Sequence, residues 1–261
     1  MQPTERIFLA VLLAHLLADF PLQSSRIVLG KRRGFAAYLQ HGLIHGVVLL
    51  GCLTLFARPW MQFSPGAVGA LLLYLGVHLA IDFLKQRLLS HHQWAADSVG
   101  TFLVDQALHL GSILVLVWWL LPPGVLRPGS PWEWSLPTQD RVLQAAVVFV
   151  AVVFGGGYLI RYLTRNLSTG AGRALGESAT QLRNAGRYIG WLERFLILTA
   201  LLMQAPSLVG LILAAKSIAR FPELKEEFAE YFLIGTLLSV SIALVGALLL
   251  LKVWDGSVSL K

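Results

Sequence analysis

The sequence predicts an all-α protein, built as a polytopic transmembrane helical bundle with about eight spans. Of the 261 residues, 56% are hydrophobic and only 13% are charged, and the mean hydropathy is +0.67. This balance is typical of multispan membrane proteins rather than of soluble domains. The apolar residues also form runs near the length of about 20 residues that a helix needs to cross a bilayer. The expected spans are 5–22, 38–57, 66–88, 99–121, 142–160, 188–204, 207–219 and 231–251. The seventh is short enough to be a half-span or an interfacial helix.

Basic residues predict the orientation of these spans. Loops 23–37 and 161–187 are rich in lysine and arginine, so we expect both to be cytoplasmic. The connection 122–141 is rich in proline and tryptophan and has balanced charges, so we place it outside. Eight crossings then put both termini outside. The net charge of +7 is concentrated in such loops, so it indicates membrane orientation rather than binding to nucleic acid.

The chain divides into three regions by composition. Residues 1–121 form a four-helix bundle with histidines and aspartates, 122–141 form the external loop, and 142–261 form accessory transmembrane helices. The first region contains a tandem two-helix repeat, about 5–57 and 66–121. Its residues 15–23 match residues 78–86 at five of nine positions. Because each unit is a helix pair, the two copies would be related by an axis along the membrane normal.

Ionisable residues recur four positions apart within the first four spans. An i,i+4 spacing places two side chains on one face of a helix. The pairs all fall near the cytoplasmic ends of their spans, at similar depth. Ionisable groups at membrane depth are costly and mark a functional site by default. The eight residues are His15, Asp19, His41, His45, His78, Asp82, Asp105 and His109.

These nitrogen and oxygen donors predict a centre for divalent metal. Eight ligands are too many for one ordinary catalytic zinc site and suit two adjacent ions. The single cysteine, Cys52, lies in an apolar segment, so the donor set has no thiolate cluster; zinc, manganese, iron and magnesium all remain open. The expected catalytic groups are Asp19, Asp82, Lys85 and Asp105. Gln23, Lys31, Gln86, Arg87 and Gln106 are expected to bind an anionic substrate. Lys31 and Arg87 also fit a role in membrane orientation alone.

The favoured function is a metal-dependent hydrolase that acts at the cytoplasmic side on an anionic lipid-linked or phosphate-containing substrate. A di-iron lipid oxidase or hydroxylase is one alternative, and a metal or proton transporter is another. Each pair taken alone also fits a polar contact that bridges two helices. For a transporter we expect polar groups in both halves of the membrane, whereas these lie at one depth.

The second half contains no histidine, but it has charges within or beside its spans. They are Glu193, Arg194, Lys216, Arg220 and Glu230. An ion-pair cluster that links the last three spans is one interpretation, and a clamp for a substrate phosphate is the other.

The motifs resemble an uncharacterised family of bacterial inner-membrane proteins that has only a domain-of-unknown-function label. The resemblance is carried by His-x3-Asp-Phe-x2-Gln at His15, His-x3-Asp-Phe-x-Lys at His78 and Asp-Gln-x2-His at Asp105. It covers roughly residues 5–121 and implies a bacterial inner-membrane location. The first half is also similar, more loosely, to bacterial membrane-bound metal-dependent hydrolases. That second resemblance implies a metal but no particular substrate.

Overall fold

Helices form all the regular structure in the described part of the chain, as the sequence predicts. The computed structural model describes residues 1, 3–57, 64–91, 98–120, 136–164, 179–220 and 226–258. It consists of two compact units, Met1–Val147 and Val148–Lys261, each treated separately below. Most of the predicted loop 122–141 and of the predicted loop 161–187 lies outside the described residues.

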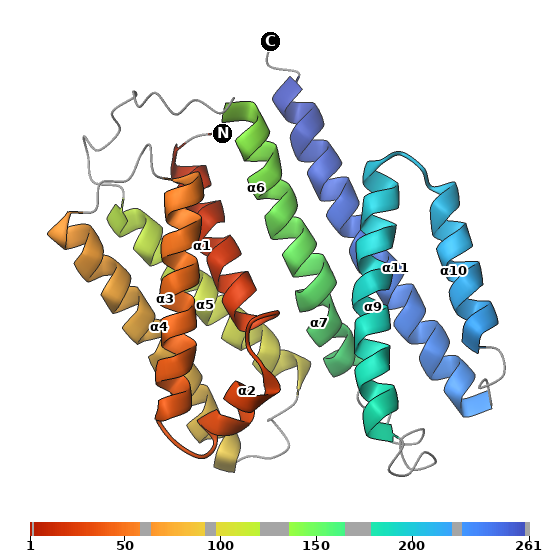
Figure 1. Cartoon of the computed structure of the whole chain (residues 1–261), viewed down its shortest axis with the longest axis horizontal. Coiled ribbons are helices and arrows are strands. Elements are labelled where there is room, and N and C mark those ends of the chain that lie inside the picture. The colour runs from red at the N-terminus through yellow and green to blue at the C-terminus, as the bar shows by residue number, and fades with distance from the viewer. Residues whose placement is uncertain are drawn as a thin grey trace. The chain divides into compact units, whose positions relative to one another are not determined.

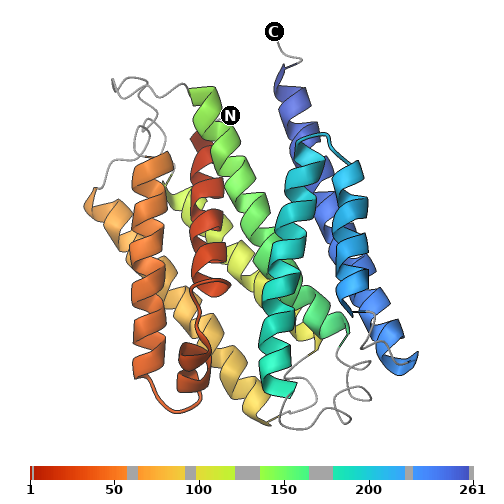
Figure 2. The same cartoon turned by 45° about the vertical axis from the view of Figure 1, so that its right-hand side comes forward.

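The first unit begins with five helices, followed by most of a sixth. They are α1 (Pro3–Asp19), α2 (Ser25–Lys31), α3 (Ala36–Phe56), α4 (Pro65–His91), α5 (Val99–Leu120) and α6 (Leu136–Val150). The helix α1 packs against α3 and α5, and α4 packs against α3 and α5 (Figures 1 and 2). These four helices therefore form a closed ring of neighbours, with α2 beside α3. This ring positions the candidate site.

The outer surfaces of these helices are apolar. On α3, one exposed stripe consists of Leu39, Leu43, Val47 and Leu50, each 49–68% exposed. A helix with apolar residues on its exposed face as well as in its core suits a lipid environment. Five helical stretches in the described residues are long and apolar enough to cross a membrane, and Ser207–Ile218 is a shorter apolar helix. The five are Ala36–Phe56, Pro65–Leu88, Val99–Leu120, Thr138–Leu163 and Phe232–Asp255.

Three of the eight predicted spans are not among the helices that are long and apolar enough to cross a membrane. The helix α1 has only 17 residues, the helix α9 (Ala179–Leu202) includes a polar first part, and α10 (Ser207–Arg220) has 14 residues. The count of eight crossings therefore stays a prediction. Several helices also run past their predicted ends, because hydropathy detects the part embedded in lipid and not the polar turns that continue it. The helix α6, for example, begins at Leu136 with Pro137 in its first turn, where a missing N–H costs little.

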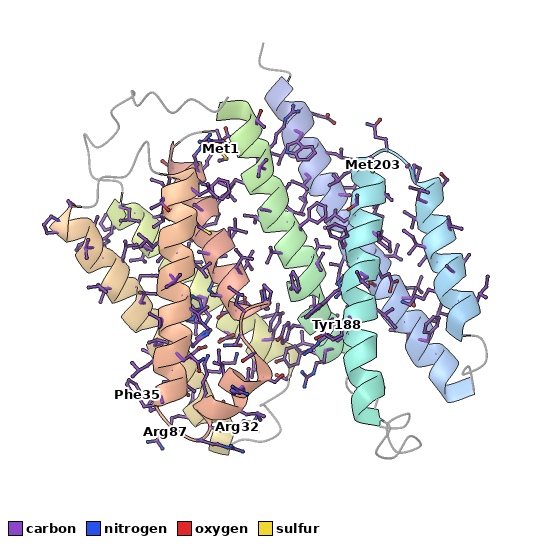
Figure 3. All side chains as sticks on the ribbon, in the orientation of Figure 1. Met1, Arg32, Phe35, Arg87, Tyr188 and Met203 are labelled. Atoms are coloured by element: carbon purple, nitrogen blue, oxygen red, sulfur yellow. The ribbon has the colours of Figure 1, made fainter. Side chains whose placement is uncertain are left out.

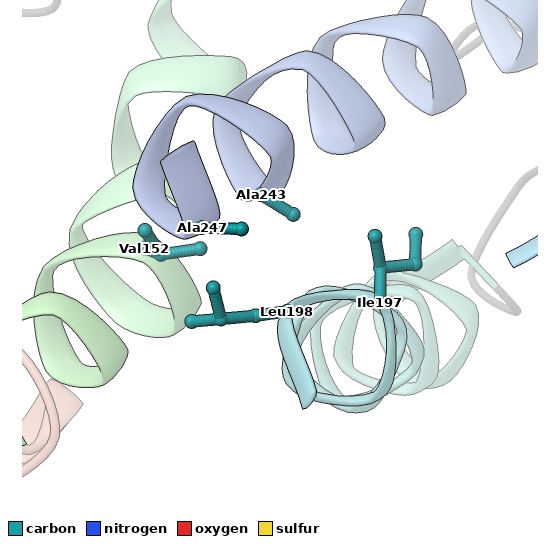
Figure 4. Packing of buried hydrophobic residues seen from close by; sticks show 5 residues of the cluster. All are labelled: Val152, Ile197, Leu198, Ala243 and Ala247. Atoms are coloured by element: carbon teal, nitrogen blue, oxygen red, sulfur yellow. The ribbon is translucent and has the colours of Figure 1, made fainter. Parts of the chain in front are cut away.

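The second unit contains a π-helical turn, η2 (Ala151–Gly155), followed by α7 (Gly156–Leu163), α9, α10 and α11 (Glu226–Val258). Its core joins η2, α9 and α11 through Val152, Ile197, Leu198, Ala243 and Ala247 (Figure 4). The reversal from α9 to α10 places Gln204 at φ 56°, and the Ala205 N–H donates to the Ala200 carbonyl. This is the left-handed cap that ends many helices.

The charges of the second unit join its helices. Lys216 of α10 donates to the Glu193 carboxylate of α9 and, at 2.9 Å, to the Thr236 hydroxyl of α11. The predicted ion-pair link is confirmed for this pair. Glu230 is exposed, and the side chain of Arg220 lies outside the described residues.

Arg194 binds a backbone carbonyl that the π-helical turn presents. Its Nε and Nη2 donate to the Val153 carbonyl oxygen at 3.1 and 2.7 Å. A Cβ at Gly157 would lie only 2.7 Å from Arg194 Nη2, so the glycines at this point let the guanidinium reach the turn. A π-helical turn has irregular hydrogen bonding, and Arg194 satisfies one of its carbonyls.

Candidate metal centre

The four helices of the ring each contribute one i,i+4 pair at the same end of the first unit. The α1 pair is in its last turns, the α3 pair lies near its start, the α4 pair lies late in the helix, and the α5 pair lies early. Figure 3 shows Arg32, Phe35 and Arg87 together at this end, with Met1 at the other. The five histidines are each at most 3% exposed. The alternating helix directions therefore bring all eight side chains to one depth.

Asp19 lies at the meeting point of the histidines. Its Oδ1 is 2.9 Å from His45 Nε2, 3.1 Å from His41 Nε2 and 3.6 Å from His78 Nε2. Its Oδ2 is 3.6 Å from His15 Nε2. Four imidazoles from three helices thus face one carboxylate. A simple bridge between two helices does not need this many donors.

Asp82 holds an equivalent position on α4. Its Oδ1 is 3.7 Å from His109 Nε2, and its Oδ2 is 3.4 Å from His41 Nε2. Lys31 of α2 also pairs with Asp82 Oδ2. The α2 segment therefore brings a cation to the centre, although the sequence predicts only a loop there. Ser24 caps this helix by accepting from the Ile27 N–H, which is a typical N-terminal signal.

Asp105 forms the third carboxylate position. Its Oδ2 accepts from Lys85 Nζ at 2.7 Å and from Gln106 Nε2 at 3.2 Å. Its Oδ1 is buried without a hydrogen-bond partner, and so is His109 Nε2, 3.6 Å away. Buried polar atoms normally have partners. These two atoms, without hydrogen-bond partners and close to each other, are both of a type that can bind a cation.

The donor atoms fall into three overlapping groups whose members all lie within 4.8 Å of one another. The groups are Asp19, His41, His45 and His78; His15, His78 and His109; and Asp82, Asp105 and His109. Each has the number and type of ligands that a divalent ion takes from a protein. His41 Nε2 and His78 Nε2 are also only 3.3 Å apart. The buried His/Asp cluster could therefore hold a metal ion, and the donors do not select which one.

The two predicted repeat units make corresponding contacts, each within its own pair of helices. Under the repeat, Asp19 corresponds to Asp82 and His45 to His109. In each copy, the carboxylate of the first helix faces the histidine of the second, at 2.9 and 3.7 Å. In the predicted repeat, α1 corresponds to α4 and α3 corresponds to α5. The packing of α1 against α5 then corresponds to the packing of α4 against α3, and both contacts are present. The repeat itself stays a prediction.

Three of the five predicted substrate residues contact the centre. Gln23 Nε2 lies 3.3 Å from His41 Nε2, and Lys31 and Gln106 contact aspartates of the centre. Gln86 is half-buried on α4. Arg87 is exposed, and its guanidinium lies over the Phe83 ring at 5.6 Å. The structure thus brings the first three to the centre and leaves Arg87 at the surface.

Two features were missed from the sequence. The Tyr74 ring lies 6.4 Å from the His78 ring, and its position four residues before His78 on the same helix face was the available signal. Arg6 is 2% exposed and pairs with Asp140 of α6. A charge inside the first predicted span needs a partner, but the sequence does not identify which acid supplies it.

Taken together, these features define a helical protein with membrane-type helices and a buried His/Asp cluster. Within it, residues 7–125 match the family described as "Protein of unknown function (DUF3307)". The resemblance predicted from the motifs is confirmed for this segment, which holds all eight donors. Neither a curated protein nor a solved structure matches the chain. The looser resemblance to metal-dependent hydrolases stays a prediction.

Proposed function

We propose that this protein is an integral membrane metal-dependent hydrolase with a dinuclear His/Asp site. Its substrate is an anionic lipid-linked or phosphate-containing molecule, reached from the cytoplasmic side. One observation carries the proposal: three groups of ligand atoms from α1, α3, α4 and α5 overlap within one buried cluster. Carboxylates and histidines on facing helices are how helical bundles build two-metal sites.

The residues divide into ligands and cations. Asp19 faces four histidines and Asp82 faces three, so both aspartates would hold metal together with those histidines. When bound, two divalent ions would acidify a water molecule and stabilise the charge on the substrate. Lys31 and Lys85 lie at the aspartates and would donate to substrate anion oxygens there. The aspartates hold these cations in place for that role.

The alternative functions differ from this proposal in what they require. Between the centre and the Arg6–Asp140 pair, buried residues of the ring are apolar apart from the Tyr74 hydroxyl, and they include Leu49, Leu53 and Ile113. A conduit for ions needs polar groups across the membrane, and this layer argues against one. A di-iron oxidase would use the same ligands, so the identity of the metal decides between it and a hydrolase.

Metal content is the direct test. We expect purified protein to contain up to two divalent ions per chain by elemental analysis, and a strong chelator to remove both the metal and the phosphatase-type activity. His78→Ala and Asp82→Ala are expected to lose metal. Iron with an oxo-bridged absorbance would favour the oxidase. Full activity in metal-free protein would overturn the proposal.

We also propose a bacterial inner-membrane location, eight crossings and both termini outside. The basic residues at the Arg32 and Arg87 end of the first unit support a cytoplasmic position for the centre (Figure 3). In a Cys52→Ala background, Arg33→Cys is expected to react with a membrane-impermeant maleimide only after the cells are opened. A cysteine added after Lys261 is expected to react from the periplasm in intact spheroplasts. The reverse pattern would overturn this topology.

A further inference from the structure

An apolar groove of about 150 Å³ lies between α4 and α5 on the first unit. Its floor consists of side chains that are largely buried, among them Ala70, Tyr74 and Leu116. Its walls, which include Leu73, Val115 and Trp119, are 59–64% exposed. Such walls would face lipid in a membrane. The groove is therefore a lipid-accessible slot between two candidate spans.

The groove begins where the metal centre ends. Ala70, Tyr74, His78, Asp82 and Lys85 follow one another at intervals of four, four, four and three residues, so they share one face of α4. Along this face of α4, the groove residues come first, the metal ligands follow and Lys85 comes last. Ala70 and Lys85 are about 22 Å apart along the helix axis, at about 1.5 Å per residue.

The partner helix repeats this order. Along α5, Asp105, His109, Ser112, Leu116 and Trp119 are spaced by four, three, four and three residues. The Ser112 hydroxyl donates to the His109 carbonyl at 2.7 Å, so its polar group is satisfied within the helix. The apolar lining and the His/Asp centre therefore follow in the same order on both walls, and Lys85 of α4 reaches Asp105 at the end of the α5 series.

We infer that the groove binds the hydrocarbon chain of the substrate, while its anionic head lies at the centre beside Lys31 and Lys85. The inference rests on the proposed function and adds which part of the substrate lies where. The occupant is a molecule with one alkyl or isoprenoid chain and one anionic head, because the groove is apolar and the cations lie on the far side of the centre. The chain enters from the bilayer between α4 and α5, and the head remains at the cytoplasmic end.

Photolabelling tests this placement. The probe is hexadecyl phosphate with a diazirine in the middle of the chain, added to purified protein in nanodiscs. We expect label on α4 and α5 peptides, competed by hexadecyl phosphate and by hexadecanol but not by inorganic phosphate. Ala70→Phe fills the floor of the groove and is expected to reduce this label at least tenfold, equal to losing burial of about two methylene groups.

Two further variants separate binding from folding. Val47→Phe adds the same side chain on the exposed face of α3 and is expected to leave the label unchanged. Trp119→Ala opens the groove at the end away from the centre, and is expected to shift the preferred probe to a longer chain. If Ala70→Phe does not fold, the change in chain-length preference in Trp119→Ala tests the inference by itself. Label spread evenly over α3, α4 and α5, with no chain-length shift in Trp119→Ala, would overturn the inference.

The same preparations distinguish this inference from the proposed function. Selective labelling of protein that binds no metal would support the groove and reject the metal centre. Protein that contains metal but shows no selective labelling would reject the groove alone.

Discussion

Replacing Asp19 by Asn is expected to lower the affinity of the protein for divalent cations by more than about 100-fold. Even outer-shell partners of a metal ligand change affinity by roughly 10- to 100-fold, and Asp19 is the carboxylate that four histidines face. The amide keeps the shape of the side chain but removes its charge. Titration of metal-free protein with Zn²⁺ and Mn²⁺ against a competing chelator measures the change.

Asp140→Asn is the matched control for this variant. Asp140 lies in the same unit and pairs with Arg6 and the N-terminal amine, away from the eight donors. We expect it to leave metal affinity unchanged, although it removes an ion pair. If Asp19→Asn bound metal as tightly as this control, Asp19 would not be a ligand, and the cluster would be a set of contacts between helices.

Replacing Lys216 by Met is expected to destabilise the second unit by about 3–5 kcal/mol, because removing one partner of a buried ion pair leaves an uncompensated charge. Glu193 is 5% exposed, and its Oε1 already has no hydrogen-bond partner. The pair also ties α9, α10 and α11 together through Thr236. Denaturation in mixed micelles, followed by tryptophan fluorescence, measures the loss.

The double variant Glu193→Leu with Lys216→Met is expected to recover most of this stability, since apolar replacement of a buried pair is often neutral or favourable. Lys252→Met removes an exposed lysine from α11 and serves as the control. A loss in the double variant as large as in Lys216→Met would show that the pair itself stabilises the unit. That result would contradict the explanation that Lys216→Met destabilises the unit by leaving the Glu193 charge without a partner.

The sequence predicts the candidate centre better than it predicts the helices around it. The i,i+4 spacing and the alternating direction of successive spans place the eight donors on one face of each helix and at one depth, which needs only helical periodicity. The rotation of each helix toward the others is set by packing. The partners of the lysines were less accessible. Lys31 reaches Asp82 because α2 is a helix, and a seven-residue helix has no apolar period long enough to detect.

The second unit shows a different limit. The Arg194 contact depends on a π-helical turn at Ala151–Gly155, and no local pattern distinguishes that turn from an ordinary helix. The adjacent charges in Glu193 and Arg194 suggested one shared cluster. In the structure they have different partners: Glu193 pairs with Lys216, and Arg194 donates to the Val153 carbonyl. Tertiary packing, rather than sequence spacing, selects these partners.

The two ends of the His/Asp cluster are chemically unequal, and under the predicted repeat His41 corresponds to Asp105. The group around Asp19 offers three nitrogens and one oxygen, whereas the group around Asp82 offers two oxygens and one nitrogen. Nitrogen donors suit zinc and iron, and oxygen donors suit magnesium and manganese. Loading would then be sequential, with the nitrogen-rich position occupied first and the other exchanging more readily. Under the proposed dinuclear site, the two positions would then differ in the metal that they prefer.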